Sequence, residues 1–128
     1  MTLIPSAAVR SVGAAALLAS LPLFAHHSYA MFDMQKEVAL QGTVQTFQWT
    51  NPHIWIDIVV INKSSGKPEN WSIEGQGPFE LVKVGWRHDS LKAGDKVSLV
   101  IHPLKRGSNG GALMKIAVNG RELGRKNG

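Results

Sequence analysis

Residues 53–61, HIWIDIVVI, carry the most regular alternation of apolar and polar positions in this chain. Its even positions, 54–60, are all aliphatic, whereas the odd positions include His53, Trp55 and Asp57. A period of two predicts a β-strand with one buried face and one face open to ligands or solvent. We therefore expect the aliphatic side chains to face a core and the other set to point outward.

Shorter patterns of the same kind predict further strands on both sides of this one. Expected strands cover residues 37–49, 53–61, 71–74, 95–102 and 112–118, with a last short strand near 121–123. Thr50-Asn51-Pro52 is typical of a turn, and residues 62–70 and 106–111 are typical of loops. Residues 78–84, PFELVKV, predict a short helix, because proline suits the first helical turn and Gly85 can end it.

The resulting order is β-β-β-α-β-β within residues 37–118. An all-β domain with one short helix between its third and fourth strands favours a small, OB-like, five-stranded Greek-key barrel. A small antiparallel sandwich remains the alternative. Residues 26–36 are expected to form an amino-terminal segment, and residues 119–128 a basic, polar tail.

Residues 1–25 have the three-part form of a cleavable signal peptide. Arg10 provides the basic start, an apolar stretch follows over residues 12–24, and Ala25 suits the last position before the cut. This stretch is shorter than the roughly 20 apolar residues of a membrane span. We expect export to the periplasm and no membrane span in the mature chain, with an uncleaved anchor helix as the alternative.

The charge and the composition narrow the function further. The chain has 14 Lys and Arg against 9 Asp and Glu, and no cysteine. Disulfides, thiolate metal sites and cysteine nucleophiles are therefore excluded. The basic residues are dispersed, and exported proteins rarely meet nucleic acid, so the sequence predicts no nucleic-acid partner. A metal ion, a small ligand or a periplasmic protein is expected instead.

The strongest candidate chemistry follows the expected cleavage site. A cut after Ala25 would leave His26 at the amino terminus, where its α-amino group and imidazole can chelate one metal ion, and His27 follows directly. A cut one residue earlier would offer a square plane of nitrogen ligands, and both geometries suit Cu(II). Met31 and Met34 add thioethers, which favour Cu(I). Alternatively, these residues form a polar tail, with Met31 and Phe32 packing onto the domain.

Two further histidines are expected at the rim of the barrel. His53 begins the second strand and His102 ends the fourth, so either is a candidate additional ligand. Either could also be structural, closing a turn or ending a strand in solvent. His88 is interpreted as a surface residue. A non-metal function is the alternative, in which Trp55, Asp57 and Asn51 form a ligand- or partner-binding face with His53.

The sequence gives little support for an enzyme. It contains no paired carboxylates at a useful spacing, no G-x-S-x-G, no H-E-x-x-H and no phosphate-binding glycine loop. A copper oxidase built on the amino-terminal histidine would be chemically permitted, but we expect a protein that carries or sequesters its metal.

The chain resembles a family of small exported bacterial proteins whose domain has no assigned function. The resemblance rests on HHSYAMFD at residues 26–33, GTVQTFQWTNPHIWI at 42–56, the strand around Trp71, and GWRHDSLKAGDKVSLVIHP at 85–103. It implies an exported, β-rich protein of one domain, in which residues 26, 27 and 51–53 are the positions to follow. It implies no activity.

Overall fold

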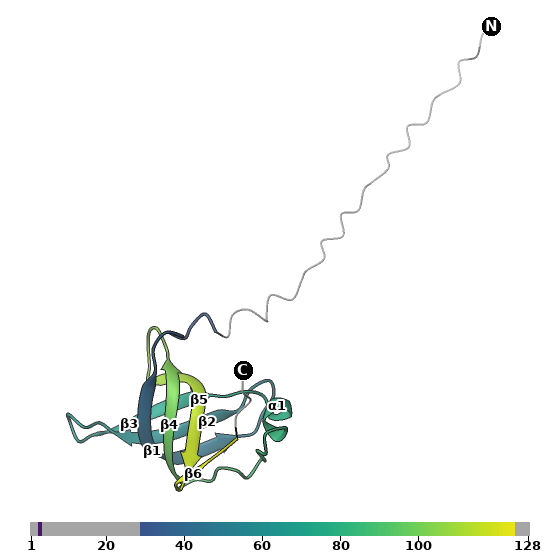
Figure 1. Cartoon of the computed structure of the whole chain (residues 1–128). Coiled ribbons are helices and arrows are strands. Elements are labelled where there is room, and N and C mark those ends of the chain that lie inside the picture. Colours follow the sequence, from purple (N-terminus) through teal and green to yellow (C-terminus); the bar gives the residue numbers. More distant parts are fainter. Residues whose placement is uncertain (1–2, 4–28, 125–128) are drawn as a thin grey trace.

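The computed structural model describes Leu3 and residues 29–124, so the predicted signal peptide, apart from Leu3, lies outside the described residues. Six strands and one short helix make up the domain (Figure 1). In chain order they are β1 (Val38–Gln48), β2 (Trp55–Ile61), β3 (Pro68–Glu74), α1 (Pro78–Val82), β4 (Lys96–Pro103), β5 (Gly110–Val118) and β6 (Arg121–Glu122).

The first five strands form a closed barrel. The order in the sheet is β3-β2-β1-β4-β5-β6, and a parallel pairing of β3 with β5 closes it. β1 makes the corner, because its first half pairs with β4 and its second half with β2. This is the order of elements expected from the sequence, with the helix between the third and fourth strands.

Alternation along the strands fills the barrel with aliphatic side chains. Ile54, Ile56 and Ile58 are completely buried, as the period of two predicted. The same holds for Ile73 of β3 and Ile101 of β4. Each such side chain contributes about 1.5–3 kcal/mol through burial, which suits a small domain held together without disulfides.

The element ends differ from the prediction chiefly at β3. Residues 68–70 were expected in a loop, but β3 begins at Pro68 because β2 continues to Ile61 and the two strands pair to their ends. A tight turn joins them, in which the N–H of Gly66 donates to the carbonyl of Asn62 at 2.8 Å. β5 likewise begins two residues earlier than expected, and α1 ends two residues earlier.

The segment before β1 lies along the end of β4. The N–H of Asp33 donates to the carbonyl of Pro103 at 2.8 Å, and that of Lys105 to the carbonyl of Met31 at 2.9 Å. Phe32 forms a bridge with Leu104 and is only 4% exposed, so this residue packs onto the domain as the alternative interpretation of the segment had it. Met31 remains 48% exposed.

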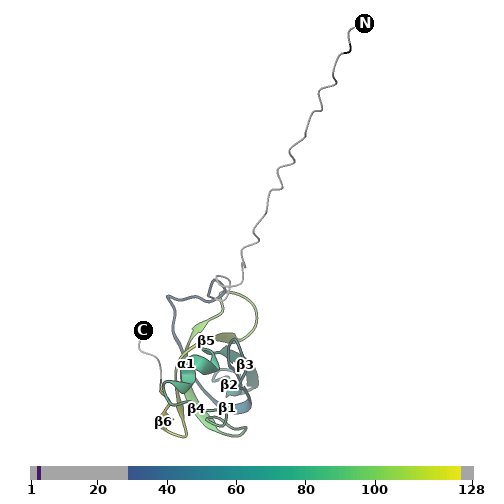
Figure 2. The ribbon, with the colours of Figure 1, turned by 90° about the vertical axis from the view of Figure 1, so that its right-hand side faces the viewer.

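The helix α1 lies on the opposite side of the barrel from the tip of the β2–β3 hairpin (Figure 1), and in Figure 2 it lies in front of the barrel. Its Leu81 is buried in the core, whereas Phe79 and Val82 face outward. No helix in the described part of the chain is long and apolar enough to cross a membrane.

Candidate functional site

The turn that leads into β2 is packed tightly against the residues that follow β3. The hydroxyl of Thr50 donates to the carbonyl of His53 at 2.9 Å, and the Asn51-Pro52 bond is cis. A Cβ atom on Gly77 would lie 2.5 Å from the carbonyl oxygen of Pro52, so only glycine allows this approach. The backbone around His53 is therefore fixed on both sides.

The side chain of His53 is oriented by a carboxylate. Its Nδ1 lies 2.6 Å from Oε1 of Glu74, the last residue of β3. The carboxylate accepts this hydrogen bond from the Nδ1–H group, and in a neutral imidazole the lone pair is then on Nε2. Glu74 is 11% exposed and His53 31%, which makes this a partly buried, charge-assisted hydrogen bond. Carboxylates orient many metal-binding histidines in this way.

A cleft opens beside this pair. It is lined by Tyr29, Asn51, Pro52, His53, Gln76, Gly77, Phe79 and Glu80. Two of these side chains, Tyr29 and Phe79, are strongly exposed, at 59% and 73%. The cleft thus combines an oriented imidazole with exposed aromatic rings and receives the first residues of the described amino-terminal segment.

The other predicted metal ligands are not brought to His53 by described contacts. His26 and His27 lie outside the described residues, and Met31 and Met34 are exposed without lining the cleft. The described residues contain no group of three or more His, Asp or Glu side chains that could hold a metal ion. Any site at His53 therefore needs donors from elsewhere in the chain.

His102 is held in a different environment. It lies on β4, and its Nδ1 is 2.7 Å from the carbonyl oxygen of Lys36. This contact ties the segment before β1 to the end of β4. His102 does not line the cleft of His53.

The residues of the predicted ligand-binding face differ in what their side chains do: some are open to a ligand, and Asp57 is bonded within the barrel. Trp55 pairs across the strands with Glu74 and is 37% exposed, so it is available for contacts. Asp57 accepts hydrogen bonds from the hydroxyls of Thr46 at 2.7 Å and Ser72 at 2.8 Å. Its carboxylate therefore links three neighbouring strands. Asn51 lines the cleft.

Comparison with known proteins assigns the chain to a family. The model of a family of unknown function, DUF6152, matches residues 15–114. The chain belongs to this family. The predicted resemblance to a family without an assigned function is thereby confirmed. No curated protein is detectably similar to the chain.

A solved structure confirms the OB-like fold of this DUF6152 member. The crystal structure of Rim1, a mitochondrial single-stranded DNA-binding protein from S. cerevisiae, matches it with a TM-score of 0.51 at 9% sequence identity. The match covers 67% of this chain and 95% of the Rim1 chain. At this identity the likeness concerns the fold alone.

The same comparison corrects one prediction. Nucleic acid was excluded as a partner because the basic residues are dispersed and the chain was expected to be exported. That exclusion is wrong, because the barrel of this family member is similar to that of a protein that binds single-stranded DNA. Dispersed charge is a weak criterion for OB-like barrels, since aromatic stacking contributes much of their binding to single strands.

Sequence reasoning missed Glu74 as a residue of the candidate site. It was considered only as a member of a carboxylate pair, which it does not form. Its position could have been found from the hairpin, because a tight β2–β3 turn places Glu74 opposite Trp55 and beside His53. Because the connection between these strands was expected to cover residues 62–70, the pairing of Glu74 with Trp55 could not be derived from the sequence.

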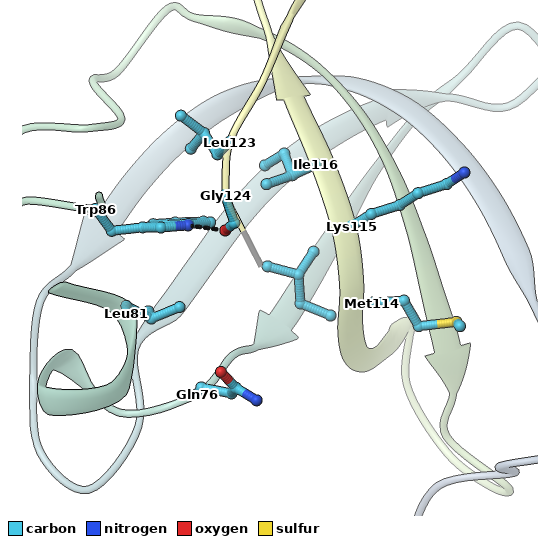
Figure 3. A pocket seen from close by; sticks show the side chains of 9 residues that line it. Gln76, Leu81, Trp86, Met114, Lys115, Ile116, Leu123 and Gly124 are labelled. Atoms are coloured by element: carbon cyan, nitrogen blue, oxygen red, sulfur yellow. Dashed lines mark hydrogen bonds between the residues drawn. The ribbon is translucent and has the colours of Figure 1, made fainter. Parts of the chain in front are cut away.

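A second cavity, of about 60 Å³, lies between α1, β5 and the end of β6 (Figure 3). Its walls include the apolar side chains of Leu81, Trp86, Ile116 and Leu123. The indole N–H of Trp86 points across it and donates to the carbonyl of Gly124. This cavity is a seam between the helix and the barrel, with few polar groups to orient a ligand.

Proposed function

We propose that this protein is an exported binding protein for a metal ion, copper above other metals, with His53 as one ligand and His26 and His27 as the others. The observation that supports the proposal is the hydrogen bond from His53 Nδ1 to Glu74. This bond fixes the plane of a ring that lines the cleft, and in the neutral ring it leaves the lone pair on Nε2 for a metal ion.

Chain connectivity supports the same site. Tyr29 lines the cleft together with His53. His27 precedes Tyr29 by two residues, so covalent geometry keeps their Cα atoms within about 7 Å of each other. The amino-terminal histidines can therefore reach the cleft without any rearrangement of the barrel.

The available donors agree with the choice of metal. Two imidazoles, the amine of a newly formed amino terminus and a third imidazole make a nitrogen-rich set, which suits Cu(II). The exposed Met31 and Met34 would favour the reduced ion. His102 is not included, because it lies outside the cleft and its Nδ1 contacts Lys36. In this proposal the protein carries or sequesters the copper.

The proposal is tested on the exported mature protein. Mass spectrometry first establishes the amino-terminal residue, and Cu(II) affinity is then measured in competition with a chelator. We expect one tightly bound Cu(II) and at least about a hundredfold loss of affinity in His26→Ala and in His53→Ala, since each removes a primary ligand. His88→Ala, an exposed histidine away from the cleft, should bind copper like the parent protein.

Unchanged copper titrations for His26→Ala would refute the amino-terminal site. Unchanged titrations for His53→Ala alone would leave a site made by the amino terminus without the barrel, contrary to the proposal.

Binding through the outer face of β2 is the second candidate function. The exposed Trp55 favours it, because OB barrels bind along the second and third strands and single-stranded bases stack on aromatic rings. Rim1, with a similar fold, is a single-stranded DNA-binding protein. A labelled oligothymidine titrated at low and high salt tests this candidate. Trp55→Ala should lose binding and Trp55→Phe should retain most of it, whereas no binding to the parent protein would exclude nucleic acid.

A further inference from the structure

One half of β1 has a free backbone edge. β1 pairs with β4 from Val38 to Thr43, but its pairing with β2 begins only at Thr43. Along residues 38–42, every second residue therefore directs its N–H and C=O away from β4. No backbone hydrogen bond to these groups is found within the described residues.

A second free edge faces the first. Val60 and Ile61 of β2 extend beyond the β1 pairing and, among the described strands, pair only with β3. The two edges diverge from the point where Gly42 lies against Val59, so closely that an added Cβ would be 2.6 Å from the Val59 carbonyl oxygen. Figure 1 shows the hairpin of β2 and β3 projecting to the left of β1, so that the two edges bound a corner between β1 and this hairpin.

This corner is a groove rather than a gap filled by side chains. Residues 39–43, 59–64 and 96–98 line it, together with side chains from the ends of β3 and β5. Ile61 is 58% exposed there. A strand lying about 4.8 Å from β1 would have backbone partners on β1 and an apolar side chain beside it.

The edge of β1 lacks the protection that strand edges normally carry. Natural edges are blocked by proline, charged side chains or bulges. The free part of β3, which β5 does not cover, begins with Pro68 and carries Glu69. Residues 38–42 of β1, VALQG, contain no proline and no charge, and the irregularity of β1 lies further along, between Val44 and Thr46.

Two of the three charged side chains that line the groove are basic. Lys63 and Lys96 both line it. Its carboxylate, that of Glu69, accepts hydrogen bonds from Asn62 at 2.6 Å and from the Trp71 indole at 3.4 Å. The net field in the groove therefore favours an acidic ligand.

We propose that this groove binds an extended peptide segment of a partner protein, which adds to β1 as a strand and carries acidic residues beside Lys63 and Lys96. Backbone hydrogen bonds to residues 38–42 would supply most of the affinity, and the lysines the preference for acidic flanks. A second copy of the barrel fits the corner less well, because the projecting hairpin flanks the edge. The peptide site is independent of the metal proposed at His53.

The experiment selects binders from a phage library of random peptides, about seven residues long so that they span the free edge. The bait is the mature protein. The best peptide is synthesised with and without N-methyl groups on alternate backbone nitrogens, and both forms are titrated by fluorescence anisotropy. We expect the selected peptides to be acidic and strand-forming. In NMR spectra of the protein, the bound peptide should change the chemical shifts of backbone amides only at residues 38–42 and 60–61. N-methylation of the peptide should lower its affinity at least about tenfold.

Two lysines of the β2–β3 turn provide matched variants. Lys63 lines the groove, whereas Lys67 is also exposed but does not line it. Lys63→Glu should weaken the peptide at least about threefold, and Lys67→Glu should not, since only the first charge faces the ligand. The proposal is overturned if no peptide is enriched, if N-methylation has no effect, or if the protein is a dimer with its β1 edge protected by the second copy.

Discussion

The two ends of β2 differ in the kind of chemistry they offer. At the start, the turn residue His53 has its ring fixed by Glu74 and faces a cleft. At the other end, Val60 and Ile61 have no comparable polar side chain, but they flank a backbone edge that no described strand covers. One end is suited to a metal ion or a small polar ligand, and the other to a peptide backbone.

This difference follows from where the barrel closes. Near His53, β2 is paired on both sides, with β1 and with β3, and the bond from Ile54 N–H to the Gln76 carbonyl continues that pairing beyond the strand. Near Ile61, β1 has already turned toward β4. Rigid, fully paired backbone can position a side chain accurately, whereas an unpaired backbone can itself bind.

The largest expected effect tests whether the start of β2 is packed more tightly than its other end. Ile54→Ala should lower the free energy of unfolding by about 2–5 kcal/mol, because the side chain is fully buried and leaves a cavity. Ile61→Ala should change it by less than about 0.5 kcal/mol, since that side chain is 58% exposed. Urea unfolding of both variants measures the two values. Equal losses would mean that the β2–β3 hairpin is as well packed as the barrel.

The next effect concerns the fixed histidine. Glu74→Ala should weaken Cu(II) binding about 10- to 100-fold, because the His53 ring loses the carboxylate that orients it. Glu69→Ala is the matched control, since Glu69 is also a half-buried carboxylate of β3 but bonds to Asn62 at the other end of the hairpin. Chelator competition compares the two. A similar loss in both variants would indicate a general effect on β3 and not a role in orienting His53.

The fold was largely predictable because burial imposes a period of two. The alternation in residues 53–61 identified the inward-facing isoleucines, and turn residues located the connections. The start of β3 was not predictable from pattern, because Glu69 and Asn70 are polar and are recruited into the strand by pairing with Val59 and Val60. Asn70 is exposed, and the half-buried Glu69 carboxylate accepts hydrogen bonds from Asn62 and the Trp71 indole, so neither polar residue opposes strand formation.

The candidate site was predictable only in part, since single residues can be read from sequence but contacts across strands cannot. His53 and Asn51 were identified from their position after the first strand. Glu74 was missed because its role depends on the register between β2 and β3. The free edge of β1 leaves no trace in the sequence, because it consists of backbone groups that every residue carries.

A smaller effect tests whether Asp57, on the outer face of β2, stabilises the fold or binds a ligand. Asp57 was predicted to belong to a ligand-binding face, but its carboxylate is bonded to Thr46 and Ser72. Asp57→Ala should lower the free energy of unfolding by about 1–2 kcal/mol, because two hydroxyls lose an ionised acceptor at a partly exposed site. Urea unfolding measures this, and copper titration should show no change. Lost copper binding with intact stability would place Asp57 in the site instead.

The smallest effect distinguishes the two histidines of the rim. His102 and His53 both have Nδ1 occupied, but the partner of His102 is the carbonyl oxygen of Lys36, at 2.7 Å. His102→Ala should change Cu(II) affinity by less than about threefold and stability by less than about 1 kcal/mol. The reason is redundancy: the segment before β1 also bonds to β4 through Asp33 and buries Phe32.

Copper titration and urea unfolding of His102→Ala measure both quantities. A loss of copper affinity as large as that of His53→Ala would show that the amino-terminal ligands bind on the β4 side of the rim. In that case Tyr29 would mark the path of the chain rather than the position of the metal. The comparison of Cu(II) affinity between the two histidine variants thus decides which side of the barrel receives the amino terminus.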